Sequence, residues 1–416
     1  MGHGLASRRV FSPATDHRLP ILNFWSCWPA DTARPTPNST SRRAPPSMVL
    51  AAMTMALLVA GCASRPEADA LTPALAQAAD AKPHTLLVAT TRARDPNPGA
   101  VFSGERAGGK LDFASLTLTV PPTHKPGDIE WAKQQPGNPK TDMVVREASY
   151  RDTDQDFIQS LNAELAKRPV GERKVFVFVH GYNTSFPEAV FRLTQMVHDS
   201  EGPGVPVLFT WASRGKVEDY VYDTNSATAA RDNLERTLNL IVASQAEEIT
   251  ILAHSMGNWV TMETLRQMKI SGHVIPSKRL GKIILASPDI DVDVFKAQLK
   301  RYGKPDKPFI VIVSHDDKAL GLSDLLAGGK QRLGAYSNDA ELASLGVVVV
   351  DMTDVKAQDR MNHGKFAQLA QMVPQLKGAL AKQAASAGET LKEDLSAEGI
   401  KVSGLEQLSA PSTSAK

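Results

Sequence analysis

The chain has 416 residues, of which 42% are hydrophobic and 22% charged, and its formal net charge is +2. By length alone the chain could hold roughly two or three domains. The sequence has no block of like charges and no basic–aromatic interleaving, so a nucleic-acid-binding surface is not expected. With only Cys27 and Cys62 present, neither a disulfide framework nor a thiolate metal site is expected.

The segment before the main body of the chain indicates export. Residues 48–61 are almost all apolar, but they are too few to span a bilayer, which takes about 20 residues. The run predicts a lipoprotein signal peptide, and its end, V-A-G-C at 59–62, resembles a bacterial lipobox. We therefore expect Cys62 to carry a lipid. A buried core helix is the alternative interpretation.

The flanking segments lack the patterns of a folded domain. Residues 1–47 are rich in Arg, Pro and Ser, and we expect them to be untranslated or disordered, with translation starting near Met48. Residues 62–83 predict a tether, and residues 383–416 predict a mostly disordered tail. Ala63 follows the lipobox instead of the aspartate associated with inner-membrane retention. The expected location is therefore the bacterial cell envelope, lipid-anchored at the outer membrane and facing the periplasm.

Strand and helix patterns alternate between residues 84 and 382. The predicted strands are 85–91, 111–120, 174–179, 205–211, 249–253, 282–286, 308–313 and 347–351. The predicted helices include 155–167, one starting near Pro187, 227–243, one through Trp259, 292–302, 320–326 and 366–382. This order predicts one α/β domain, with a mostly parallel sheet and helices on both faces.

A candidate nucleophile lies in the stretch 247–259. The sequence A-H-S-M-G-N at 253–258 fits the G-x-S-x-G nucleophile elbow, with Ala253 replacing the first glycine. The turn strains the serine backbone, and the flanking positions must be small because strand and helix cross closely. We predict Ser255 as the nucleophile. A serine that caps an ordinary helix is the alternative.

The partners of such a serine are a base and a carboxylate that orients it. In an open parallel sheet they should follow later strands, in the order Ser, Asp/Glu, His. His363 follows the strand 347–351 and is the predicted base, with an ordinary surface histidine as the alternative. Asp316 and Asp317 follow the strand 308–313. We predict Asp317 as the acid and Asp316 as runner-up, and one of the two could be a helix N-cap.

The oxyanion of an acyl-transfer reaction needs hydrogen-bond donors. We predict the backbone N–H of Met256, after the nucleophile, and that of Tyr182, in the loop after the strand 174–179. Gly181 permits a close backbone approach. His180 ends the strand, and its ring is expected to support the loop and not to act as the base.

The aspartates at 289, 291 and 293 raise the question of a metal site. Alternate carboxylates on an extended loop could hold Ca²⁺, but neither the glycine turn nor the distal glutamate of an EF-hand is present. Capping and rim roles are the favoured interpretation, and neither a metal nor a cofactor is expected.

Four motifs resemble those of bacterial α/β-hydrolases of unknown function in the esterase/lipase superfamily. They are V-F-V-H-G-Y-N at 177–183, W-A-S-R-G at 211–215, A-H-S-M-G-N at 253–258 and A-S-P-D-I-D-V-D-V-F at 286–295. The resemblance covers about 85–380 and implies an α/β-hydrolase fold, often in lipoproteins or secreted proteins, but no particular substrate. The family pattern S-x-x-D-K-A-L, here at 314–320, supports Asp317, and a histidine after the last strand supports His363.

The sequence therefore predicts a serine hydrolase acting on a small-molecule or lipid ester through an acyl-enzyme. Ser255 would attack, His363 would carry the proton and Asp317 would orient the ring. Two alternatives stay open: a non-catalytic envelope lipoprotein that binds through a hydrolase fold, and acyl transfer or amide cleavage by the same triad.

Overall fold

The computed structural model describes residues 66, 69–202, 204–303, 305–368, 395–396, 399–405 and 407. The predicted disordered segment 1–47, the signal peptide 48–61 and the lipidation site Cys62 lie outside these residues, and they stay predictions. The same holds for the predicted helix 366–382 beyond residue 368. Within the described part of the chain, no helix is long and apolar enough to cross a membrane.

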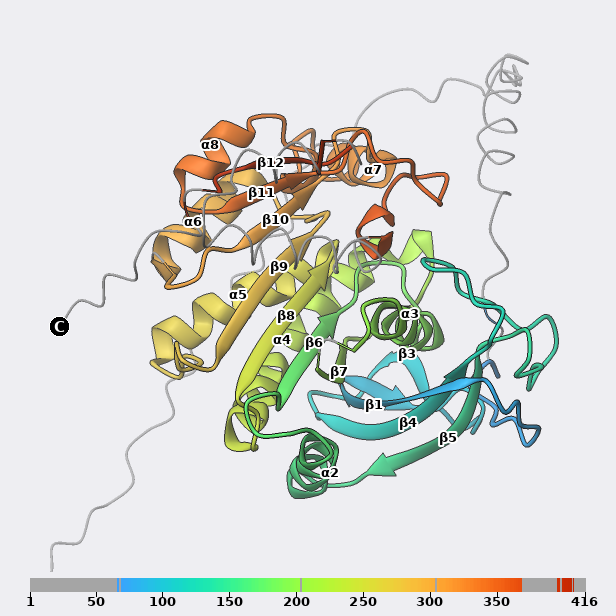
Figure 1. Ribbon diagram of the computed structural model, residues 1–416. Helices are drawn as coiled ribbons and strands as arrows, with labels where there is room; N and C mark the ends of the chain where they lie inside the picture. The colour runs from blue at the N-terminus through green and yellow to red at the C-terminus, as the bar shows by residue number, and fades with distance from the viewer. Residues whose placement is uncertain are drawn as a thin grey trace, which may run out of the picture. The chain divides into compact units, whose positions relative to one another are not determined.

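A ten-stranded sheet forms the centre of the domain (Figure 1). Its strands, in spatial order, are β12 (Lys401–Ser403), β11 (Val348–Asp351), β10 (Ile310–Val313), β9 (Leu280–Ala286), β8 (Glu248–His254), β6 (Lys174–Val179), β7 (Val205–Thr210), β1 (Lys82–Thr90), β4 (Asp112–Val120) and β5 (Val144–Arg151). The strands from β11 to β1 pair in parallel, whereas β12, β4 and β5 pair antiparallel. The predicted mostly parallel α/β sheet is therefore confirmed.

Helices cover both faces of this sheet, as predicted. They are α2 (Asp154–Ala166), α3 (Phe186–Asp199), α4 (Tyr220–Ala243), α5 (Met256–Ser271), α6 (Val292–Tyr302), α7 (Lys318–Leu326) and α8 (Asp339–Ser344). Alternate residues of β6 enter opposite cores. Val177 packs with α2, α4, α5 and α6, whereas Phe178 packs with α3. Burial on both faces explains the continuous apolar run of this strand.

Several element boundaries differ from the prediction. Helix α4 begins at Tyr220, seven residues before the predicted start at 227, because its first two turns are largely polar and lack a clear apolar stripe. Strand β5 was not predicted, since only its first two residues are buried. The small β2 (Arg92–Arg94) and β3 (Phe102–Arg106) hairpin lies where an irregular loop was expected.

The two segments flanking the predicted domain are partly ordered. The predicted tether packs onto the domain from about Asp69, because Leu71 is fully buried and its N–H donates to Gly99 O at 2.9 Å. In the predicted tail, Lys401–Ser403 form edge strand β12, and the preceding Ile400 is fully buried. The predicted boundaries 84 and 382 are therefore too narrow. In both segments a few apolar residues pack on the core. The local composition of the segments does not predict this packing, because most of their residues are polar or small.

The packing of Leu71 can be tested against a matched neighbour. Leu71→Ala should lower the free energy of unfolding by about 2–4 kcal/mol, because it leaves a cavity in the core. Leu75→Ala should change it by less than about 0.5 kcal/mol, because Leu75 is 91% exposed. Urea unfolding of both variants measures the difference. Equal values would mean that the segment is a free tether after all.

Candidate active site

Ser255 lies at a sharp turn between β8 and α5. Its backbone angles are φ 52° and ψ −125°, in a region that residues with a Cβ rarely adopt. The small Ala253 that precedes it in β8 is fully buried. The strand, strained serine and helix predicted from the sequence are thus all present, and the turn presents Ser255 at the carboxyl end of the central strand.

Two glycines let the loop after β6 press against this turn. A Cβ on Gly257 would lie 2.3 Å from His180 O and 2.6 Å from Val179 O. A Cβ on Gly181 would lie 2.7 Å from Ser255 Cβ. Both contacts are far inside van der Waals distance, so the elbow and the predicted oxyanion loop can approach each other only with glycine at these positions.

Asn258 holds the elbow from inside the protein. Its Nδ2 donates to Ser255 O at 2.9 Å and to Ala286 O at 2.8 Å, and its side chain is fully buried. The Asp289 N–H also donates to Ser255 O. The sequence motif contains Asn258, but its supporting role was missed. The signal in the sequence is a polar residue in the first turn of a helix that is expected to pack on the sheet, since a buried polar residue there needs hydrogen-bond partners.

The side chains of Asp317 and His363 form a hydrogen bond. His363 Nδ1 lies 2.7 Å from Asp317 Oδ2, and the Asp317 side chain is fully buried. The other oxygen, Asp317 Oδ1, accepts the N–H groups of Ala319 and Leu320 at 3.0 Å, so the same residue is the N-cap of α7. Asp317 therefore has the predicted capping role, and its other oxygen has the contact with His363 that a triad acid would need.

Asp316 has a different partner. Its Oδ1 is 2.7 Å from Nζ of Lys365, a buried lysine that also donates to Met352 O and Thr353 O. Asp316 Oδ2 accepts from Asn362 Nδ2 at 2.7 Å. Asp316 and Lys365 thereby tie the loop after β10 to the segment that carries His363. Lys365 was not singled out from the sequence, where a lone lysine is normally a surface residue.

His363 has a raised pKa. Burial of the ring lowers the pKa, but the hydrogen bond with Asp317 and the negative charges of Asp317, Asp289 and Asp359 outweigh it. The Asp317 contact uses Nδ1 and leaves Nε2 as the free nitrogen of the ring. This is the tautomer that a base next to a serine requires.

His254, the residue before Ser255, contacts His363. The His254 ring lies between those of His363, at 4.6 Å, and Phe366, at 4.1 Å. Burial, followed by the nearby His363, lowers the pKa of His254 well below its usual value, so this ring is neutral. Among the described residues, no hydrogen bond connects Ser255 Oγ with His363. Such bonds are often long or misaligned in proteins without substrate.

The predicted oxyanion donors, Met256 and Tyr182, belong to the two segments that meet at Ser255. Met256 is the first residue of α5, so its N–H has no partner within the helix. Tyr182 belongs to the loop that Gly181 brings against Ser255. The next residue, Asn183, has φ 55°, and its N–H donates to the buried Asp223 Oδ2 at 3.2 Å. Asp223 thus fixes the backbone that carries the Tyr182 N–H.

A buried polar network supports the same loop from below. His180 Nδ1 donates to Gly181 O at 2.8 Å, which is the loop contact expected of this ring. His180 Nε2 accepts from Thr210 Oγ1 at 2.8 Å. Burial, and then the charge of Arg92, lower the pKa of His180 to about 3. The fully buried Arg92 donates to Thr184 O and Ser213 O at 2.8 and 2.7 Å.

The three aspartates after β9 have separate roles. Asp291 caps α6 by accepting the N–H groups of Asp293 and Val294. Asp289 is buried, accepts from Ser323 Oγ at 2.6 Å and lies 3.2 Å from Arg332 Nε. Asp293 is exposed and faces Lys330 at 3.7 Å. Asp291 thus has the predicted capping role and Asp293 lies at the surface, whereas Asp289 is buried in an ion pair and has neither role.

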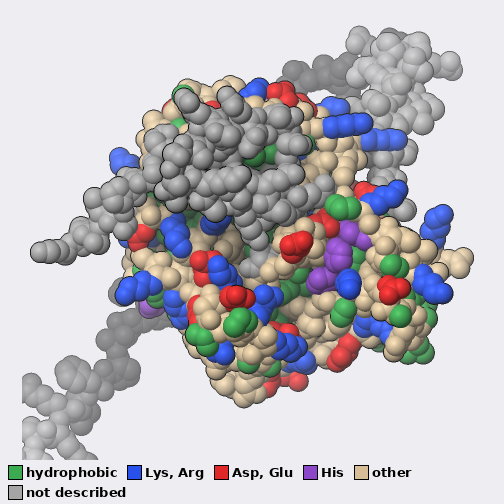
Figure 2. Space-filling view, viewed as in Figure 1, with side chains coloured by type: hydrophobic (Ala, Val, Ile, Leu, Met, Phe, Trp, Pro, Cys, Tyr) green, Lys and Arg blue, Asp and Glu red, His purple; other side chains and the backbone are tan. Residues whose placement is uncertain are grey.

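Histidine side chains also gather at the surface in the view of Figure 2. Near the end of α3, His84 Nε2 and His198 Nδ1 are 3.0 Å apart, and His124 lies within 2.9 Å of Glu130 and 2.7 Å of Asp199. Burial would lower the pKa of His124, but the hydrogen bonds with Asp199 and Glu130 raise it to about 9. These contacts link β1, α3 and the loop after β4, so we assign them to packing.

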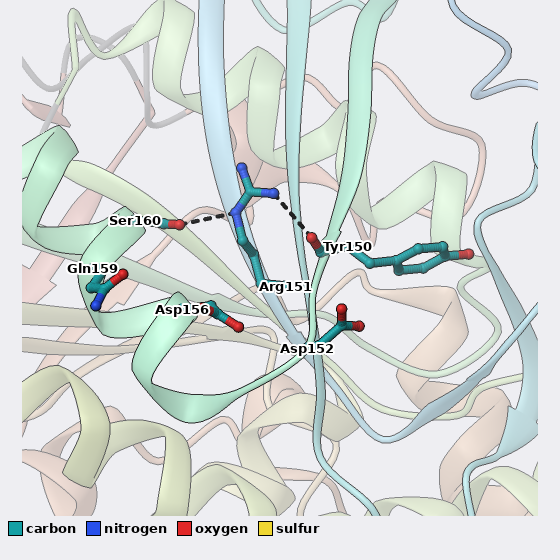
Figure 3. Close-up of a pocket in the computed structure, with 6 residues that line it drawn as sticks. All are labelled: Tyr150, Arg151, Asp152, Asp156, Gln159 and Ser160. Atoms are coloured by element: carbon teal, nitrogen blue, oxygen red, sulfur yellow. Dashed lines mark hydrogen bonds between the residues drawn. The ribbon is translucent and has the colours of Figure 1, made fainter.

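A shallow pocket elsewhere on the domain does not contain any of the predicted site residues. It lies between β5 and α2 and is lined by Tyr150, Arg151, Asp152, Asp156, Gln159 and Ser160 (Figure 3). Arg151 donates to Ser160 Oγ and to Tyr150 O within it. β5 is five strand positions from β8, or roughly 24 Å at the usual strand spacing. The lining of this pocket includes no nucleophile–base pair, so we take the region around Ser255 as the candidate active site.

The close approach at Gly257 yields a stability test. Gly257→Ala should lower the free energy of unfolding by about 2–3 kcal/mol, because the new methyl group meets backbone oxygens that cannot move freely. Gly321→Ala, inside α7 with nothing within 4 Å, should instead stabilise by about 0.5–1 kcal/mol. Denaturant unfolding distinguishes the two signs. A neutral Gly257→Ala variant would contradict the observed crossing.

Comparison with known proteins identifies the family. A search of the curated proteins finds no match. Among solved structures, a crystal structure of a mutant of the esterase rPPE is similar at 15% identity, with a TM-score of 0.30, over 53% of this chain and 88% of that one. Residues 153–379, more than half of the chain, match the family described as "Alpha/beta hydrolase of unknown function (DUF900)". The chain therefore belongs to this family of α/β-hydrolases.

Proposed function

We propose that the chain is a serine hydrolase that cleaves carboxylic esters through an acyl-enzyme. The observation that carries the proposal is the hydrogen bond between buried Asp317 and His363, at the same edge of the sheet as the strained Ser255. A buried carboxylate that fixes the ring tautomer is what a general base requires. Membership of an α/β-hydrolase family supports hydrolysis in general.

The proposed reaction has two halves. Ser255 Oγ attacks the ester carbonyl carbon while its proton passes to His363 Nε2, and the N–H groups of Met256 and Tyr182 donate to the oxyanion. His363 then gives the proton to the leaving alcohol as the ester C–O bond breaks. In the second half, water attacks the acyl-enzyme with His363 as base, which releases the acid and restores Ser255.

Exposed apolar side chains near the site support an apolar acyl group in the substrate. Val217 lies in the short 3-10 helix Val217–Asp219 before α4, Val221 lies in the first turn of α4, and Leu322, Leu325 and Leu326 lie on α7; all five are at least 41% exposed. A hydrogen bond of 3.1 Å between Tyr220 Oη and Ser323 Oγ joins the two helices. The helix that carries the three leucines begins directly after Asp317, so it starts at the proposed reaction centre.

We also propose, from residues 48–62 alone, that the chain is lipid-anchored through Cys62 in the bacterial envelope. An ester presented by a membrane would then be within reach of the site. This proposal is independent of the catalytic one, because its residues lie outside the described part of the chain.

The catalytic proposal predicts covalent labelling. Purified protein should react with a fluorophosphonate probe and hydrolyse p-nitrophenyl acyl esters, whereas Ser255→Ala should lose the label and at least about 10³-fold in kcat, since the nucleophile is gone. Ser287→Ala, a buried serine after the next strand, serves as the matched control. Absence of labelling in the folded wild type would favour the non-catalytic binding role, and turnover of amides or transfer to an alcohol would redefine the acceptor.

The raised pKa of His363 predicts the pH dependence. The base must be neutral, so kcat/KM should rise with pH through an apparent pKa above 6.5. Asp317→Asn removes the main group that raises this pKa, so the rise should move to lower pH while kcat falls by about 10²–10⁴-fold. Asp316→Asn should leave the midpoint unchanged, because Asp316 pairs with Lys365 and not with the ring. A midpoint shift with Asp316→Asn alone would make Asp316 the acid.

A further inference from the structure

Three potential metal ligands come together behind the loop that carries Asp317. We call His315, Asp339 and Asp351 the His315 cluster. His315 lies in the loop after β10, Asp339 is the first residue of α8 and Asp351 is the last residue of β11. One ligand atom from each lies within 4.8 Å of the other two. In sequence these residues are up to 36 positions apart, and no motif connects them.

The distances in the cluster match a small coordination site. His315 Nε2 lies 3.7 Å from Asp351 Oδ2 and 4.0 Å from Asp339 Oδ1. Ligands held at 2.0–2.2 Å from a tetrahedral ion are about 3.4 Å apart. The two distances from His315 would therefore have to shorten by about 0.3 and 0.6 Å, and that between the two aspartates, which is within 4.8 Å, by at most about 1.4 Å. The His315 side chain is 29% exposed, which leaves one side open to water as a fourth ligand.

One oxygen in the cluster lacks the partner that burial normally requires. Asp339 Oδ1 is buried and has no hydrogen bond in the described structure. Burial raises the pKa of Asp339, and the charges of His315 and Lys401 lower it while that of Asp351 raises it. Lys401 Nζ pairs with Asp354 at 2.8 Å, outside the cluster. A buried carboxylate oxygen without a donor, next to a second carboxylate, is costly unless a cation lies between them.

Asp351 is already oriented as a ligand. Its side chain is 9% exposed, and Oδ1 accepts from Thr353 N at 2.8 Å and Thr353 Oγ1 at 2.5 Å. Thr353 Oγ1 in turn accepts from the His315 N–H at 3.0 Å. These bonds occupy Oδ1 and leave Oδ2 directed at His315. Supporting hydrogen bonds of this kind fix the ligands of metal sites.

We propose that His315 Nε2, Asp339 Oδ1 and Asp351 Oδ2 bind a divalent transition-metal ion such as Zn²⁺. An imidazole with two carboxylates suits first-row transition metals better than Mg²⁺ or Ca²⁺, which prefer all-oxygen sites. The ion would neutralise the two carboxylates and supply the missing partner of Asp339 Oδ1.

The bound ion would clamp the two loops that hold the Asp317–His363 pair. His315 is two residues before Asp317. Thr353, which holds Asp351, accepts a hydrogen bond from Lys365 Nζ through its carbonyl oxygen. Lys365 is two residues after His363. The ion would therefore join the loop after β10 to the segment after β11 without touching the reacting atoms. Its role is structural, and it stands whether or not Ser255 is a nucleophile.

Zinc titration of the chelator-treated full chain tests the proposal. Calorimetry should show one equivalent of Zn²⁺ per chain, and Tm should rise by about 3–6 °C at a hundredfold excess over Kd. His315→Ala and Asp351→Asn should each weaken Zn²⁺ binding by at least about 100-fold and abolish the Tm shift. Mg²⁺ at the same concentration should give no shift.

His273→Ala is the matched control. His273 is an exposed histidine whose Nδ1 also lies 3.7 Å from a carboxylate, that of Glu235, but it has no second acidic partner within the cluster distance. This variant should bind Zn²⁺ like the wild type. Asp339→Asn should act differently with and without metal. Without metal, Tm should stay equal or rise, because a largely buried carboxylate whose Oδ1 has no hydrogen bond is neutralised next to Asp351. With Zn²⁺, the metal-dependent shift should disappear.

The Zn²⁺-binding and Tm measurements can each contradict the proposed site. Zn²⁺ binding that persists in both His315→Ala and Asp351→Asn would place the ion elsewhere and overturn the proposal, as would absence of binding to the folded wild type. A large loss of Tm in metal-free Asp339→Asn would mean that the carboxylate already has a protein partner, and this result would also overturn it.

Discussion

The close approach of the turn between β8 and α5 to the end of β6 is the constraint on which the rest of the site depends. At Gly257 a single methyl group would lie 2.3 Å from a backbone oxygen of the loop after β6. At this approach Ser255 has a positive φ of 52°, and the loop that contains Gly181 and Tyr182 lies against the turn. Asn258 stabilises this strained turn from within the core. The strain is therefore maintained by packing that extends over three neighbouring strands.

Buried polar groups hold the loops around this crossing. Arg92, Asp223 and His180 are buried, and their hydrogen bonds end on backbone atoms of the loops after β6 and β7. Burying such groups costs free energy unless each is satisfied, so the network stabilises only one loop arrangement. Asp316 and Lys365 do the same for the loops that carry Asp317 and His363, and the proposed metal ion would act on the outer side of those loops.

Asp317 contributes to two local structures with one side chain. One oxygen caps α7 and the other holds His363. The cap fixes the carboxylate, and the carboxylate then orients the ring and raises the pKa of His363 above that of a free histidine. A change that weakens α7 at its start would therefore also change the protonation of His363.

The sequence by itself determined the elements whose signals are local. Buried β-branched runs predicted the parallel strands, and the motif around Ser255 predicted the elbow, because two small residues and a serine between strand and helix leave few other conformations. The tertiary structure decided what depends on residues far apart in the chain. It joined Asp317, and not Asp316, to His363; it docked Leu71 and β12 on the core; and it assembled the His315 cluster from three segments. Contacts of this kind arise when chain-distant loops meet at one edge of a sheet, and no periodicity or spacing in the sequence records them.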